Sequence, residues 1–149
     1  MTSKIATLLE QLGNTWHQTI PVSEFMQIRP ESYQQQVFSV TAPLTPNINL
    51  HHTMFAGSIY TLMTLTGWGV VWLNQQLTGV KGDIVLANAN VRYLAPINAS
   101  PVAKVTWLGD DLSALAAGHR VKVKLTVELY CEGKRCAEFE GTYVSLPSQ

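Results

Sequence analysis

A polar segment that leads into a long apolar stretch holds the residues best suited to chemistry. Residues 47–60 carry Asn and His side chains and one glycine, Gly57, and residues 53–77 contain no charged side chain. The first turn of a helix presents unpaired backbone N–H groups and a positive partial charge. A carbonyl oxygen could approach such donors at Gly57, which has no side chain, and each donor stabilises an acyl-transfer oxyanion by about 3 kcal/mol. Alternatively, Gly57 is small only because the helix packs tightly there.

Nearby polar side chains are candidates for the remaining roles. Histidine is the side chain best suited to act as a base near neutral pH, and His51 and His52 precede the apolar stretch, so either is a candidate base, although loop histidines are more often ordinary surface residues. Besides Thr53 at its start, the apolar stretch contains three threonines, and their hydroxyls either face a ligand or bond to helix carbonyls one turn back. They are Thr61, Thr64 and Thr66.

A second group of polar side chains shares one face of a predicted strand. Asn88, Asn90 and Arg92 alternate with apolar residues, and a guanidinium matches phosphate geometry. This face is a candidate to bind nucleotide phosphates or to line a partner's site. Equally, it faces solvent or joins subunits. Asp83 at the start of the strand is interpreted as a turn or cap residue.

Hydrophobic periodicity predicts the elements that position these residues. Helical spacing predicts an amphipathic helix over 5–16, and β-branched residues predict a strand over 35–41, with Pro21 and Pro30 breaking the chain between them. The uncharged stretch predicts a buried central helix over 53–77, followed by Gly79 as a left-handed C-cap. Period-two alternation predicts four further strands, over 83–94, 102–108, 121–129 and 137–146.

The order of these elements favours an α+β fold, because a run of strands follows the helices. A helix that is apolar on all sides needs cover on all sides, which a curved antiparallel sheet wrapped round it provides. The side chains of the strand over 83–94 that we expect to cover the helix are Val85, Ala87, Ala89, Val91 and Tyr93. A membrane span is disfavoured by the threonines and glycines within the apolar stretch and by the lack of a flanking basic cluster.

Composition excludes several classes of protein. The chain has 149 residues, which fit one domain over 1–149, and its ten Lys and Arg balance ten Asp and Glu without any basic run. Nucleic acid is therefore not an expected partner. Cys131 and Cys136 flank a predicted hairpin turn, and we expect them to be free thiols in a reducing cytoplasm, where we place the protein. Nothing in the sequence implies a metal or another cofactor.

The sequence resembles the thioesterase-like domain at the C-terminus of YiiD, a group with the hotdog fold. The resemblance lies in residues 54–60, 65–69, 82–85 and 91–96 and extends over nearly the whole chain. It implies a long central helix wrapped by a curved antiparallel β-sheet and hydrolysis of an acyl-CoA or acyl carrier protein thioester. It also implies a homodimer whose sheets join side by side, often paired into a dimer of dimers, with the substrate at the subunit interface.

The motif of the wider hotdog thioesterases is met only in part. Asn49, Thr53 and Gly57 match it, whereas the other motif positions hold His52, Phe55 and Ala56. Many relatives carry an acid two helical turns after the last glycine, where this chain has Thr64, and a threonine hydroxyl orients water but is no general base near neutral pH. We predict as catalytic residues Asn49, Gly57 and Thr64, and as substrate contacts His52, Phe55, Ser58, Asn88, Asn90 and Arg92.

Two other hypotheses remain open. The absence of an acid at Thr64 suits a module that binds an acyl thioester without hydrolysing it. A hotdog dehydratase is disfavoured, because the central helix carries no histidine with a suitably placed acid.

Overall fold

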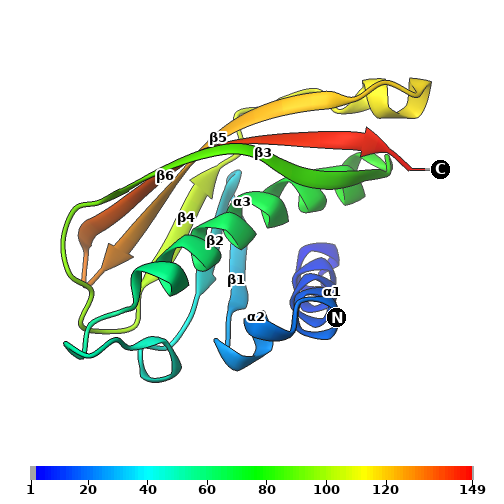
Figure 1. Ribbon diagram of the computed structural model, residues 1–149. Helices are drawn as coiled ribbons and strands as arrows, with labels where there is room; N and C mark the ends of the chain where they lie inside the picture. The colour runs from blue at the N-terminus through cyan, green and yellow to red at the C-terminus, as the bar shows by residue number, and fades with distance from the viewer. Residues whose placement is uncertain (1–2, 149) are drawn as a thin grey trace.

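The computed structural model describes residues 3–148, and residues 1, 2 and 149 lie outside that range (Figure 1). Its helices are α1 (Lys4–Thr19), α2 (Pro21–Phe25) and α3 (Ala56–Thr78), with two short 3-10 turns, η1 (Thr45–Asn47) and η2 (Ser113–Ala117). Its strands are β1 (Arg29–Gln34), β2 (Val37–Thr41), β3 (Gly82–Tyr93), β4 (Val102–Thr106), β5 (Val121–Cys131) and β6 (Lys134–Pro147).

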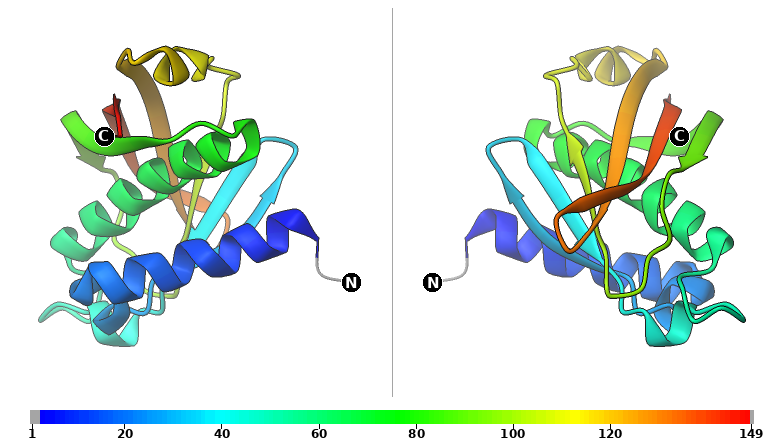
Figure 2. Two further views of the ribbon diagram at one scale, coloured as in Figure 1. Left: turned by 90° about the vertical axis from the view of Figure 1, so that its right-hand side faces the viewer. Right: turned by 90° about the vertical axis from the view of Figure 1, so that its left-hand side faces the viewer.

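The strands form one antiparallel sheet that curves around α3. Within residues 3–148 the sheet has six strands, in the order β1-β2-β4-β5-β6-β3. Helix α3 lies along its inner face and contacts β2 to β6, while α1 packs against β1 and α3 (Figures 1 and 2). The predicted α+β hotdog fold, a long central helix wrapped by a curved antiparallel sheet, is confirmed. No helix within residues 3–148 is long and apolar enough to cross a membrane.

Helix α3 is held from two sides by aromatic residues that pack on glycines. A Cβ atom on Gly69 would lie 2.8 Å from the ring of Phe38 and 2.9 Å from that of Trp16. A Cβ atom on Gly67 would overlap the ring and hydroxyl of Tyr143. The helix ends at Gly79, whose φ of 73° confirms the predicted left-handed C-cap.

Strand β1 is absent from the sequence prediction, which treated Pro30 as a break. The strand lies at the edge of the sheet, and its pairing with β2 is irregular between Pro30 and Ser32. Proline is tolerated at such a position because an edge strand does not need every N–H for pairing. Gln35 and Gln36 have φ angles of 51° and 65° and form the turn between β1 and β2. The strand predicted over 35–41 corresponds to β2, and its predicted start at residue 35 was therefore two residues too early.

The predicted inner face of β3 was wrong for the first half of the strand. Its pairing with β6 shifts between Leu86 and Asn88, so Ala87 is an extra residue. A bulge of this kind exchanges the two faces of a strand. Before the bulge Ile84 and Leu86 pack on the core and Val85 is 44% exposed. After it Ala89 and Val91 face the core as predicted, but Tyr93 is 51% exposed.

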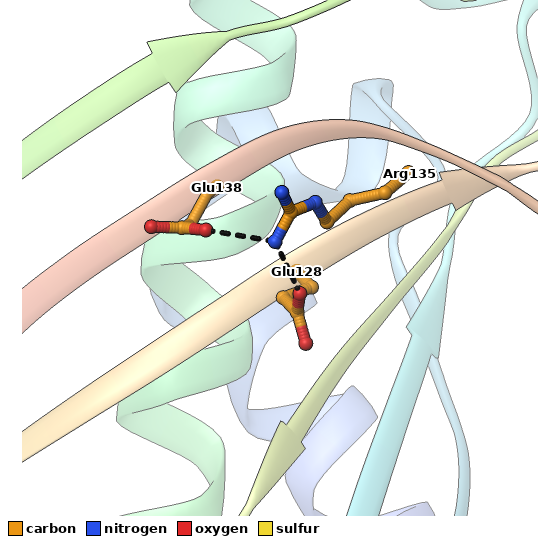
Figure 3. A network of polar contacts seen from close by, with 3 residues as sticks. All are labelled: Glu128, Arg135 and Glu138. Carbon is orange, nitrogen blue, oxygen red and sulfur yellow. Dashed lines mark hydrogen bonds and ion pairs between the residues drawn. The ribbon is translucent and has the colours of Figure 1, made fainter.

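The hairpin of β5 and β6 places two like charges side by side. Glu128 lies opposite Glu138, and the Nη1 atom of Arg135 lies 3.0 Å from a carboxylate oxygen of each (Figure 3). The cation compensates the repulsion that such a cross-strand pair would otherwise cause. Cys131 and Cys136, at the same end of the hairpin, are buried and free, as predicted.

Candidate functional site

The start of α3 offers two backbone donors. Within residues 3–148 no acceptor is paired with the N–H of Ala56 or of Gly57, and Phe55 caps the helix without a side-chain hydrogen bond. A Cβ atom on Gly57 would overlap the ring of Phe55, which is 54% exposed. The packing explanation is therefore supported by the structure, and the role of Gly57 towards a carbonyl oxygen stays a prediction. Gly57 is small because the ring packs on it, and its N–H is free to meet a ligand.

Asn49 shapes the loop that precedes α3. Its Oδ1 accepts from the backbone N–H groups of His51 and Thr53 at 2.8 and 3.2 Å, and its Nδ2 donates to Thr53 Oγ1 at 3.0 Å. Such contacts of an asparagine with the backbone just after it stabilise a tight turn. They hold His52 at a φ of 62°. Asn49 thus fixes the approach of the chain to the helix, and its amide is largely engaged within the loop.

A cavity of about 340 Å³ lies beside the first turn of α3. It is lined by Asn49, Met54, Ala56, Ile59 and residues 93–97. The Tyr93 hydroxyl donates to the Ala56 carbonyl at 3.2 Å and closes one side. This volume is at the small end of the roughly 300–1,000 Å³ typical of small-molecule sites. A larger hollow of about 530 Å³ lies around Lys104 and Tyr130 on the outer face of the sheet, away from the helix donors.

The hydroxyl of Thr64 differs from those of its neighbours on α3. Thr61 Oγ1 donates to the Gly57 carbonyl at 2.9 Å and Thr66 Oγ1 to the Leu62 carbonyl at 2.7 Å. Thr64 Oγ1 is buried without a partner among the described residues. A buried hydroxyl without a hydrogen bond costs about 1–3 kcal/mol. This hydroxyl is therefore the one of the three that is available to a bound group.

Gly57 and Thr64 share one face of α3 but lie far apart along it. Seven residues separate them, which corresponds to about 10.5 Å at 1.5 Å per residue. Two groups that both contact one reacting atom can be at most about 6 Å apart. The helix of one chain therefore cannot bring the Gly57 N–H and the Thr64 hydroxyl to the same atom.

The predicted strand residues do not line the cavity beside the helix donors of their own chain. Asn88, Asn90 and Arg92 are exposed on the face of β3 opposite the core-facing residues. The two asparagines line a hollow of about 440 Å³ together with Lys124 and Glu140. Arg92 lies opposite Glu138 in the register of β3 and β6.

The remaining predicted residues are divided between the loop and the core. His51 and His52 are exposed in the loop, and Phe55 borders the free N–H groups. Ser58 is 8% exposed and faces inward.

The sequence prediction missed Tyr93 and residues 94–97, and it missed Tyr143, whose hydroxyl donates to the Thr64 carbonyl at 2.7 Å. The glycines that leave room for the Tyr143 ring are the one feature of the sequence that could have indicated its role. In residues 3–148 no cluster of three or more His, Cys, Asp or Glu side chains could hold a metal.

Alkaline pH is expected to destabilise the fold through Tyr143. Burial, with a smaller contribution from Tyr60, raises the pKa of Tyr143 well above its usual 10.0. Because the folded pKa exceeds the unfolded one, the stability this group contributes is complete below pH 10 and is lost as the pH rises beyond it. Denaturant unfolding above about pH 10 should show a decline of up to about 1.4 kcal/mol per pH unit that Tyr143→Phe lacks. Equal declines in both proteins would contradict this assignment.

Solved structures share this fold and suggest its activity. The crystal structure described as a "putative thioesterase from Shewanella oneidensis" is 64% identical with a TM-score of 0.93, covering 95% of this chain and 99% of that one. A protein of unknown function from Chlorobaculum tepidum is 27% identical with a TM-score of 0.83, covering 95% of both chains. A Pseudomonas aeruginosa protein described as a "probable thioesterase" shares the fold with a TM-score of 0.76 at 18% identity, covering 93% of this chain and 95% of that one.

These likenesses place the protein among the hotdog-fold thioesterases, which are hydrolases of thioesters. The profile of the family described as "Putative thioesterase (yiiD_Cterm)" matches residues 9–147. The chain belongs to this family, the one that the sequence resemblance indicated.

Proposed function

We propose that the protein hydrolyses acyl thioesters of coenzyme A or of an acyl carrier protein at the N-terminal end of α3. The observation that carries this proposal is the pair of unpaired backbone donors at Ala56 and Gly57. Donors fixed at the start of a helix stabilise the negative charge that develops on a thioester oxygen. Water then adds to the carbonyl carbon, the C–S bond breaks, and a carboxylic acid and a free thiol leave.

Thr64 is the residue we assign to the water. Its buried hydroxyl has no partner in the described part of the chain, so it can accept from or donate to a water molecule. It orients the water but does not deprotonate it at neutral pH. His51 and His52, exposed in the loop before α3, are the candidates for the base.

A second copy of the chain is needed to complete this arrangement. Because Gly57 and Thr64 lie about 10.5 Å apart along α3, we assign the Gly57 N–H of one chain and the Thr64 hydroxyl of another to one site. The rest of the chain covers one face of α3 incompletely. The residues on this face are half-buried, and they are Gly57, Thr61, Thr64, Trp68 and Trp72. Strand β3 beside it is an edge strand of 12 residues with an exposed Val85.

Such an edge is a template for pairing with another strand. Joining two β3 edges would extend the sheet across the dimer and bring the incompletely covered faces of the two α3 helices together. The opposite edge, β1, is a shorter strand of 6 residues that contains a proline. The outer face of the sheet, which carries Asn88, Asn90 and Arg92, is then free to bind the phosphates of the carrier or to contact a second dimer.

The test is release of free thiol from a panel of acyl-CoA and acyl carrier protein thioesters by the purified protein. Turnover of any member supports the proposal. The alternative, a module that only binds acyl thioesters, is favoured by the absence of an acid at Thr64. Saturable binding of a non-hydrolysable acyl-CoA thioether with no thiol release across the panel would establish the alternative and overturn hydrolysis.

A further inference from the structure

Two buried aromatic rings fill the space between α3 and β6 beside Thr64. Phe139 and Tyr143 on β6 are both 0% exposed, and their ring centroids lie 6.4 Å apart. The Tyr143 hydroxyl reaches the Thr64 carbonyl at 2.7 Å. Gly141, between the two on the same strand, gives the rings room, because a Cβ atom there would lie 2.5 Å from Phe139 and 3.2 Å from Tyr143.

The helix leaves no gap on its own side of these rings. A Cβ atom on Gly67 would overlap Tyr143, so not even a methyl group fits between helix and strand at this level. Tyr60, one turn before Thr64, covers Phe139 edge-on with ring centroids 5.9 Å apart. An acyl chain that lies at Thr64 therefore cannot extend inward between α3 and the sheet.

An acyl chain that runs along the helix from Thr64 is also blocked after one turn. Trp68 follows Thr64 by four residues on the same face, and its Nε1 donates to the Ile84 carbonyl on β3 at 3.1 Å. This bond holds the indole across the gap between α3 and β3. One turn is about 5.4 Å and an extended chain advances roughly 1.2 Å per bond, so about four or five bonds fit between Thr64 and Trp68.

We propose that Phe139, Tyr143 and Trp68 restrict the site to thioesters of short acyl groups, about six carbons or fewer. This inference rests on the proposed function, because it takes the acyl group to lie against Thr64. The three side chains act as walls of the acyl site and have no part in the chemical step.

The experiment shortens the walls on β6 one at a time. Tyr143→Leu and Phe139→Leu keep an apolar side chain in the core, whereas alanine would leave a larger cavity and threaten folding. Each is expected to raise the ratio of kcat/KM for decanoyl-CoA to that for butyryl-CoA by at least about tenfold over the wild type. Affinities for the matching non-hydrolysable thioethers, measured by calorimetry, should shift in the same direction.

Phe38→Leu is the matched control for these variants. Phe38 is 0% exposed and packs on Gly69 of α3 much as Tyr143 packs on Gly67, but from β2 rather than β6. It should lose comparable stability and leave the chain-length ratio within about twofold of the wild type.

Four outcomes would count against the proposal in different ways. A wild type that prefers decanoyl-CoA would overturn it while leaving hydrolysis established. So would an unchanged ratio in both β6 variants, or an equal rise in Phe38→Leu, which would indicate general loosening of the core. A wild type that neither hydrolyses nor binds any thioester or thioether would remove the proposed function, and this inference with it.

Discussion

Replacing Gly57 with alanine is expected to lower kcat/KM for thioester hydrolysis by about 100-fold, or about 2.7 kcal/mol of transition-state stabilisation. The added methyl group would stand at the first turn of α3 and keep the thioester oxygen from the free N–H groups of Ala56 and Gly57. The free energy of unfolding should not fall. Alanine is a better helix former than glycine by roughly 1 kcal/mol, and the exposed Phe55 ring can move aside. Steady-state kinetics and urea unfolding measure the two effects.

Phe55→Ala separates the two explanations for Gly57. If Gly57 were small only to accommodate the Phe55 ring, the double variant Phe55→Ala/Gly57→Ala would recover the activity of Phe55→Ala alone. If the methyl group blocks the donors, the double variant stays as inactive as Gly57→Ala. Recovery in the double variant would therefore contradict a role for these N–H groups in catalysis.

Replacing Thr64 with valine is expected to change activity and stability in opposite directions. Valine keeps the shape of the side chain but removes the buried hydroxyl that has no partner in the described residues. Loss of an unsatisfied hydroxyl should raise the free energy of unfolding by about 1 kcal/mol. Loss of the group that orients water should lower kcat by at least about tenfold, which is about 1.4 kcal/mol of barrier.

Thr61→Val is the control for this substitution. Thr61 lies on the same helix, but its hydroxyl already donates to the Gly57 carbonyl. This variant should keep kcat within about twofold of the wild type. A similar loss of kcat in both variants, or a loss of stability in Thr64→Val without a loss of kcat, would show that Thr64 serves packing alone.

The central helix could be predicted because its signal is local. An uncharged stretch followed by Gly79 determines both a buried helix and its left-handed end, and the alternation in β5 determines a strand with one inward face. The bulge at Ala87 could not be predicted, since it arises from pairing with β6 and residues 84–87 are all apolar, which fits either face of the strand. Strand β1 was missed because Pro30 was interpreted as a break in the chain, although proline is tolerated in a strand at the edge of a sheet.

The candidate site was predicted in part, for the same reason. A glycine at the start of a predicted helix can be recognised from the sequence alone, and so can a threonine two helical turns later. Whether a threonine hydroxyl bonds to its own helix depends on a side-chain rotamer that packing selects, so Thr61 and Thr64 are alike in sequence and different in the fold. Tyr143 reaches Thr64 from a strand 79 residues away in the chain, a distance that no local pattern spans.

The most direct test of a shared hydrolytic site is to combine two inactive chains in one dimer. Gly57→Ala and Thr64→Val chains carrying different affinity tags would be co-expressed, and the mixed dimers isolated on both tags in succession. Each mixed dimer would contain one site with both groups intact and one with neither, so hydrolysis should return to about half of the wild-type rate per dimer. Mixed dimers no more active than their parents would contradict a site built from Gly57 of one chain and Thr64 of the other.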